Sequence, residues 1–179
     1  MITKYIEFKN FKKKIGTKKI LNDLKKLLKE NNEIIKSLGL TYKNSYNNKI
    51  IKKYQKYSNV RVIGMGGSTL GTESIYKFLK HKIKKNFIFF DNLNPNPITS
   101  KKKEGFLNLI VSKSGNTIET ISNVNIILKK DKDKNIFITE NKKSYLLLLA
   151  EKLKAEIVHH NNFIGGRYSV LSEVGMLPA

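Results

Sequence analysis

The feature that most constrains the fold is a series of short apolar runs that alternate with segments of helical spacing from residue 60 onward. Runs of about five residues between such segments are typical of βαβ units and a parallel sheet. The runs are apolar on both faces, which favours a sheet covered by helices on both sides. The expected strands are 60–64, 87–91, 107–111, 135–139 and 156–160, and the expected helices are 70–83, 118–129 and 143–154.

These patterns predict an α/β fold over residues 58–179, as a three-layer αβα sandwich with a five-stranded parallel sheet. A loop that contains Pro95 and Pro97 is expected after the second strand, and the final helix is expected to be incomplete at Ala179. Ligands of such sheets bind beyond the carboxyl ends of the strands, so the residues that follow each strand are the candidates for a site.

Residues 1–57 are expected to form a helical lead-in to this domain. Leucine and isoleucine recur at spacings of three and four over 18–38, which predicts one amphipathic helix. Thr17 is the expected N-cap of that helix and Gly39 its stop. The polar stretch 41–58 is expected to be partly helical.

The net charge of +21 raises the question of a nucleic-acid or anionic-membrane partner. Only two of the 35 basic residues are arginine, the side chain that forms paired hydrogen bonds with phosphates and guanine edges. The abundance of lysine, asparagine and isoleucine instead fits the residue usage of an AT-rich genome. We expect no nucleic-acid partner, and we keep a lysine-rich nucleic-acid binder as an alternative function.

The chain is expected to be cytoplasmic. It has no apolar run near the roughly 18 residues that a membrane-spanning helix needs, and its first residues lack the apolar stretch of a secretory signal. It also has no cysteine, which excludes disulfides and thiol chemistry. We therefore expect no membrane partner.

The first candidate motif is GMGGSTLG at 64–71, between a strand and a helix. Glycines let the backbone approach a ligand, and a helix start presents unpaired N–H groups, so the loop suits a phosphate. The alternative is a tight turn in which Ser68 is only an N-cap. A dinucleotide fingerprint would need glycine at position 69, where this chain has Thr69, although Asp91 stands about where a ribose-binding acid would.

Two further motifs follow later strands. SKSGNTIET at 112–120 offers four hydroxyls and a glycine after the third strand, a composition that can surround a phosphate. Taken alone, it is also what a capped helix start looks like. GGRYSV at 165–170 follows the last strand, and Arg167 can project its guanidinium into the same cleft or lie on the surface beside a helix cap.

In their order and approximate spacing, the three motifs resemble those of the glucose-6-phosphate isomerase family, over about residues 58–179. The resemblance implies the sugar-isomerase fold, and it implies that Arg167 stabilises the enediolate. It further implies that the sugar phosphate is bound by Gly67, Ser68, Ser112, Lys113, Ser114, Thr117 and Gly166. Gly115, Asn116 and Glu173 depart from the commoner family residues, and the departure at Glu173 puts the packing of the final helix in doubt.

The resemblance also implies an activity, the interconversion of glucose 6-phosphate and fructose 6-phosphate through a cis-enediolate, as in glycolysis and gluconeogenesis. No metal or cofactor is implied, and the full-length enzyme is expected to be a homodimer. The family's shuttling glutamate, ring-opening histidine and late lysine lie downstream of GGRYS, so the chain alone is expected to be inactive. Glu119 is then a loop-ordering residue, and His159 and His160 are strand-end or surface residues. A non-catalytic sugar-phosphate sensor of the same fold is the other alternative.

Overall fold

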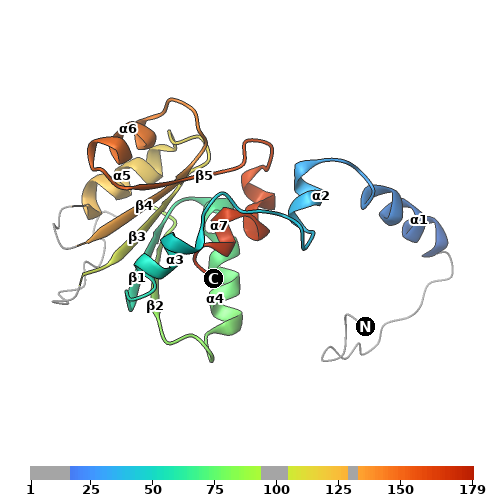
Figure 1. Cartoon of the computed structure of the whole chain (residues 1–179), viewed down its shortest axis with the longest axis horizontal. Coiled ribbons are helices and arrows are strands. Elements are labelled where there is room, and N and C mark those ends of the chain that lie inside the picture. Colours follow the sequence, from blue (N-terminus) through green and yellow to red (C-terminus); the bar gives the residue numbers. More distant parts are fainter. Residues whose placement is uncertain (1–16, 94–104, 129–132) are drawn as a thin grey trace.

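A computed structural model describes residues 17–93, 105–128 and 133–179 of the chain, and its core is one parallel sheet (Figure 1). The five strands are paired in the order β2-β1-β3-β4-β5, and every pairing is parallel. They agree with the expected strands to within a residue at either end. Their bounds are β1 Asn59–Ile63, β2 Asn86–Phe90, β3 Leu107–Val111, β4 Lys134–Thr139 and β5 Glu156–His159. The loop expected around Pro95 and Pro97 lies outside the described residues.

Helices cover both faces of the sheet, which confirms the three-layer arrangement (Figure 1). Helices α5 and α6 pack on one face, and α3, α4 and α7 pack on the other. The helices of this domain are shorter than expected by a few residues. Their bounds are α3 Asn48–Tyr54, α4 Leu70–Leu79, α5 Ile118–Ile127, α6 Tyr145–Lys152 and α7 Glu173–Met176.

Alternation along each strand divides the core into two clusters. In β1, Val60 and Val62 face α3 and α7, where Ile50 and Tyr54 cover the sheet. Ile63 faces the other way, toward α5 and α6. Because side chains alternate in direction along a strand, an apolar run with both faces covered is buried throughout.

The face below α3 is not fully covered. An apolar cavity of about 230 Å³ lies between α3, the sheet and the last residues of the chain. Its lining includes Leu109 and Ile136 of the sheet, together with Pro178 and Ala179. The short α7 therefore leaves part of the sheet's apolar surface open.

The lead-in differs from the single helix expected over 18–38. It forms two helices, α1 Thr17–Leu27 and α2 Glu33–Ser37. Asn32 causes the break, because its side chain accepts a hydrogen bond from the backbone N–H of Ile35 (2.9 Å) and so starts a new helix. The expected stop at Gly39 is nearly right, since α2 ends two residues earlier.

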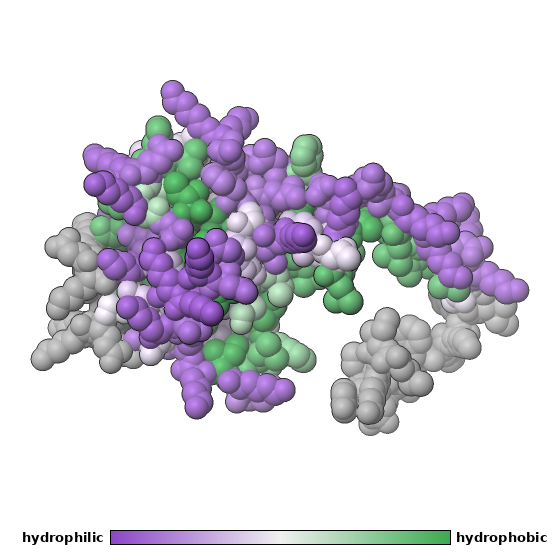
Figure 2. Space-filling view, viewed as in Figure 1, coloured by the Kyte–Doolittle hydropathy of each residue, from purple (hydrophilic) through white to green (hydrophobic). Residues whose placement is uncertain are grey.

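Helix α1 buries none of its residues, and its apolar side chains lie along one side of an arm that projects from the body (Figures 1 and 2). Helix α1 is amphipathic, as its spacing predicts. Its apolar side does not pack against any other described part of the chain. Across residues 17–93, 105–128 and 133–179, no helix is long and apolar enough to cross a membrane.

One strand residue breaks the apolar pattern. Arg61 on β1 is 3% exposed and pairs with Asp133, whose Oδ2 lies 2.8 Å from Nη1. The guanidinium also stacks 3.6 Å from the ring centre of Phe106, whose backbone N–H donates to Asp133 Oδ1 (2.8 Å). Asn108, next to Arg61 in the register, completes the buried polar cluster at 3.4 Å. One of the two arginines is therefore structural.

Removal of one partner of this pair should be costly, because the other charge stays buried. We expect Asp133→Ala to lower the free energy of unfolding by about 3–5 kcal/mol. Lys53→Ala breaks the exposed pair with Glu156 and should cost less than about 1 kcal/mol. Urea-induced unfolding followed by circular dichroism measures both, and equal losses would contradict the assignment of Arg61 to the core.

Candidate functional site

The glycine loop after β1 folds against the segment after β5. It forms a short 3₁₀ turn, Gly66–Ser68, at the carboxyl end of the sheet. A Cβ atom added at Gly67 would lie 2.3 Å from the carbonyl oxygen of Gly166 and 2.8 Å from the amide nitrogen of Arg167. Only glycine permits this approach, so two of the three motifs are in backbone contact.

The segment after β5 forms a second 3₁₀ turn, Gly166–Leu171, in which Arg167 is exposed. Buried Ser169 supports the turn, because its hydroxyl donates to the carbonyl of Gly166 (2.7 Å) and lies 3.4 Å from that of Gly67. The carbonyls of both glycines thus share one hydroxyl. The backbone around Arg167 is held, and its side chain is free to reach solvent or a ligand.

The hydroxyl loop after β3 lies beside the glycine loop. A Cβ atom at Gly64 would lie 2.8 Å from the carbonyl oxygen of Val111, the last residue of β3. Within the hydroxyl loop, the oxygens of Ser112 and Thr117 lie 3.0 Å apart, and Ser114 accepts from the backbone N–H of Asn116 (3.3 Å). Neighbouring strands β1 and β3 therefore present their loops side by side.

Gly115 and Asn116 each have a structural reason. Gly115 has a φ of 65°, and a Cβ atom there would lie 2.1 Å from the hydroxyl of Ser144. Asn116 accepts a hydrogen bond from the backbone N–H of Tyr145 (2.9 Å) at the start of α6. Gly115 and Asn116 thus dock the hydroxyl loop onto α6.

Two helices begin at these loops without a side-chain cap. In α2, α3 and α6 the N-cap side chain accepts a hydrogen bond from a first-turn N–H group. The N-caps of α4 and α5 are Thr69 and Thr117, and neither makes such a bond. The hydroxyl of Thr69 instead donates to the carbonyl of Gly66 (3.2 Å). The start of each helix keeps unpaired donors and the positive end of a dipole, which is the environment that an anion needs.

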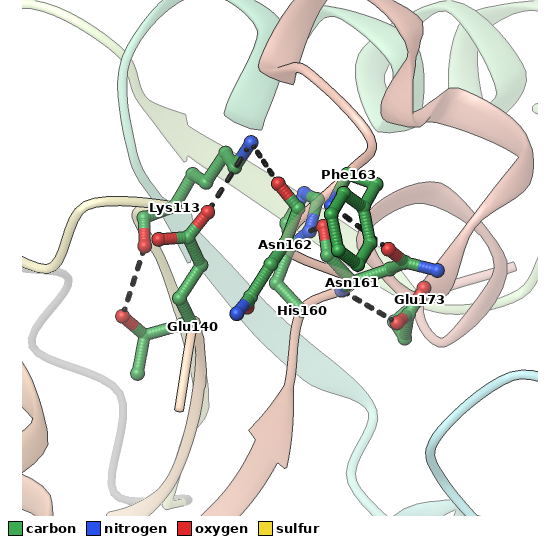
Figure 3. A network of polar contacts seen from close by, with 8 residues as sticks. Lys113, Glu140, His160, Asn161, Asn162, Phe163 and Glu173 are labelled. Carbon is green, nitrogen blue, oxygen red and sulfur yellow. Dashed lines mark hydrogen bonds and ion pairs between the residues drawn. The ribbon is translucent and has the colours of Figure 1, made fainter. Parts of the chain in front are cut away.

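Lys113 points toward β4 and β5. Its ammonium donates to the carbonyl of Asn162 (2.8 Å) and lies 3.2 Å from Glu140 Oε1 (Figure 3). The backbone N–H of Glu140 donates in turn to the carbonyl of Lys113 (3.1 Å). Lys113 therefore links the ends of three strands, and its contacts within the described residues leave one of its three protons for a ligand.

Glu173, whose packing was in doubt, is 1% exposed and well bonded. Its carboxylate accepts from the phenol of Tyr42 and from the backbone N–H of Asn161, both at 3.1 Å. Burial and the nearby Glu173 carboxylate raise the pKa of Tyr42 to about 12, so the phenol keeps its proton over the physiological range. The final helix is therefore held at its first residue.

The two histidines lie at the end of β5, as expected. His159 is exposed, whereas His160 is 3% exposed and its Nδ1 lies 2.8 Å from the carbonyl of Asn161. Burial lowers the pKa of His160 below its ordinary value of 6.5. Its Nε2 has no partner in the described part of the chain. A neutral ring donates from Nδ1, so His160 orders the backbone that leads to Arg167.

Several contacts that stabilise the candidate site were not predicted from the sequence patterns. Glu140 stands directly after β4, so the strand-end rule that found the three motifs could also have found it. Tyr42 and Asn161 carry no local signal, because their partner Glu173 is distant in the sequence.

Glu119, expected to order the loop, lies in the first turn of α5. Among the described residues no cluster of three or more acids and histidines could hold a metal ion.

Solved structures share this fold. A hypothetical protein from Thermus thermophilus matches with a TM-score of 0.61 and 27% identity, over 73% of this chain and 34% of that one. A tagatose-6-phosphate ketose/aldose isomerase from Escherichia coli matches with a TM-score of 0.58 and 19% identity, over 73% of this chain and 39% of that one. The latter likeness supports the fold alone. The sheet order thus defines an α/β domain with the sugar-isomerase fold.

Sequence comparison narrows that class to one family. The chain matches phosphoglucose isomerase over residues 12–179, and it belongs to this family. A glucose-6-phosphate isomerase from Methanocaldococcus jannaschii is 40% identical over 137 residues, which are 71% of this chain and 33% of that protein. The chain spans about a quarter to a third of the length of such curated relatives. The resemblance read from the three motifs is confirmed.

The contact between the glycine loop and the arginine segment predicts a contrast between two alanine variants. Gly67→Ala places a methyl group against the backbone of Gly166, so we expect it to lower the free energy of unfolding by about 1–3 kcal/mol. Gly166→Ala meets nothing within 4 Å and should change it by less than about 0.5 kcal/mol. Urea unfolding midpoints test the contrast, and a harmless Gly67→Ala would show that the two segments are apart.

The lowered pKa of His160 predicts a pH dependence. Below pH 6.5 the unfolded chain takes up a proton on this histidine that the folded chain binds less readily, so stability falls as the pH falls. We expect His160→Asn, which keeps an N–H donor but does not titrate, to lose less stability than the unaltered chain between pH 7.5 and 5.5. Urea unfolding at both pH values measures this, and parallel losses would contradict the burial of a neutral ring.

Proposed function

We propose that the chain is the sugar-phosphate-binding part of a glucose-6-phosphate isomerase. The observation that carries the proposal is the pair of uncapped helix starts, α4 and α5, on neighbouring strands. Both point unpaired N–H groups to the carboxyl edge of the sheet, where an α/β fold binds its ligands. Two such helix starts beside serine and threonine hydroxyls can bind a phosphate without a buried lysine.

The residues have separate roles in this proposal. Gly67 and Ser68 on one side, and Ser112, Ser114 and Thr117 on the other, surround the phosphate with amides and hydroxyls. Lys113 contributes its remaining proton and the positive charge that Glu140 only partly offsets. The backbone of Gly166 lies against Gly67, which brings Arg167 beside the glycine loop.

Arg167 supplies the charge for chemistry. Isomerisation removes the C2 proton of the open-chain aldose, forms a cis-enediolate, and returns a proton to C1 to give the ketose. A negative charge develops on the enediolate oxygens, and a guanidinium stabilises it because its charge is permanent and its donors are fixed in a plane. The base that moves the proton is proposed to lie beyond this chain, so the chain alone binds but does not turn over substrate. The homodimer and the cytoplasmic location stay predictions.

Fructose 6-phosphate binding to the purified chain tests this function. Isothermal titration calorimetry should detect binding, and a coupled assay for glucose 6-phosphate should detect no turnover. Arg167→Ala should weaken binding about 10- to 100-fold, since hydrogen bonds to charged groups contribute about 1.5–3 kcal/mol. Lys84→Ala is the matched control, because it removes one exposed charge before β2, at the opposite edge of the sheet, and should leave affinity within about twofold.

Three results would contradict the proposed function. Equal effects of Arg167→Ala and Lys84→Ala would mean that only net charge attracts the ligand. Tight DNA binding that falls steeply with salt, with no sugar-phosphate binding, would favour the lysine-rich nucleic-acid binder. Turnover by the chain alone would show a complete site within residues 1–179.

A further inference from the structure

We propose that Glu173 is a positioning residue for Arg167, because its buried carboxylate closes the segment that contains Arg167 into a loop and ties that loop to the helical lead-in. The inference rests on the proposed function, since it assigns Glu173 a part in the same site. The contacts concerned are those of Tyr42, Asn161 and Glu173, here called the Glu173 junction.

The Glu173 carboxylate closes the loop that contains Arg167. Asn161 follows β5, Glu173 begins α7, and Arg167 lies midway between them. The backbone N–H of Asn161 donates to Glu173 Oε1 (3.1 Å), so the two ends of the segment meet at one carboxylate. Short closed loops have little conformational freedom, and the position of Arg167 is restricted accordingly.

Hydrogen bonds also attach this loop to the helical lead-in. The phenol of Tyr42 donates to Glu173 Oε2 (3.1 Å) across 131 residues of sequence. Ser45 lies 3.4 Å from Oε1 and donates its proton to the carbonyl of His159. The side-chain amide of Asn161 donates to Glu33 Oε2 (3.1 Å) on α2. Three residues of the lead-in thus contact the end of β5 or one end of the segment that contains Arg167.

The hydroxyl loop and the glycine loop support the arginine segment from the side away from the lead-in. The carbonyl of Asn162 accepts from the ammonium of Lys113 (2.8 Å), which comes from the hydroxyl loop (Figure 3). Gly166 touches Gly67 of the glycine loop. The arginine segment is therefore fixed from the lead-in, the hydroxyl loop and the glycine loop together, and the Glu173 junction joins its two ends.

The charge of the buried Glu173 carboxylate argues against a role in packing alone. Glu173 is 1% exposed, and no cation lies within ion-pair distance of it among the described residues. Burial of a carboxylate without a cation costs free energy of desolvation. An apolar or small residue would pack equally well at this position without that cost. The hydrogen bonds that the carboxylate accepts from Tyr42 and Asn161 are what an apolar or small side chain could not reproduce.

The exposure of the two arginines allows a direct experiment on the full chain. Arg61 is 3% exposed and ion-paired, whereas Arg167 is exposed, so phenylglyoxal should modify Arg167 selectively. The rate of modification, with and without fructose 6-phosphate, reports the site. Binding is measured in parallel by calorimetry on the unaltered chain and on Glu173→Ala, Glu173→Gln and Tyr42→Phe.

We expect Glu173→Ala to weaken fructose 6-phosphate binding about tenfold, the equivalent of one lost hydrogen bond to a charged group. Glu173→Gln keeps an acceptor for Asn161 and should recover most of the affinity, and Tyr42→Phe should fall between them. Val174→Ala is the matched control, because Val174 is the next residue, is 2% exposed and belongs to the sheet core. It should lower the unfolding midpoint but leave affinity within about twofold.

Two outcomes overturn the inference: wild-type affinity in Glu173→Ala, or an equal loss of affinity in Val174→Ala. If fructose 6-phosphate neither binds nor slows modification of the unaltered chain, the proposed function fails instead. The inference is then decided without ligand, by amide hydrogen exchange over residues 161–172. Glu173→Ala must accelerate exchange there relative to Val174→Ala, and unchanged exchange contradicts a positioning role.

Discussion

The close approach of two glycines is the contact on which the candidate site depends. A side chain at Gly67 would collide with the carbonyl of Gly166, so the loop after β1 must be bare backbone where it meets the segment after β5. The two strands are not neighbours in the sheet, because β3 and β4 lie between them. The arginine segment therefore crosses the carboxyl edge of the sheet, and its arrival beside the glycine loop brings Arg167 there.

The remaining contacts preserve that arrangement. Lys113 connects the hydroxyl loop to the ends of β4 and β5, and the Glu173 carboxylate joins the arginine segment to the lead-in. These groups satisfy one another, whereas the first-turn N–H groups of α4 and α5 have no side-chain cap. These donors lie at the edge where the loops meet, which is where the two helix starts could bind an anion.

Local patterns predicted most of the fold and the motifs of the site. The five apolar runs became the five strands because both faces of a parallel sheet are buried, and the glycine-rich and hydroxyl-rich loops followed the strands as expected. Contacts between distant residues were not predictable. Asn32 broke a helix whose apolar spacing looked continuous, and Asp133 supplied the counter-ion that lets Arg61 occupy a strand. The partners of Lys113 and Glu173 come from other elements, and only the assembled fold brings them into reach.

The central claim is that the three loops bind one sugar phosphate, and an amide chemical-shift map tests it most directly. Fructose 6-phosphate titrated into isotopically labelled chain should shift the amides of Gly67, Ser68, Ser112–Thr117 and Arg167 together, with one dissociation constant. Amides at the amino edge of the sheet, such as those of Asn59 and Leu107, should not move. Shifts confined to one loop, or spread over the lysine-rich surface without saturation, would contradict a shared site.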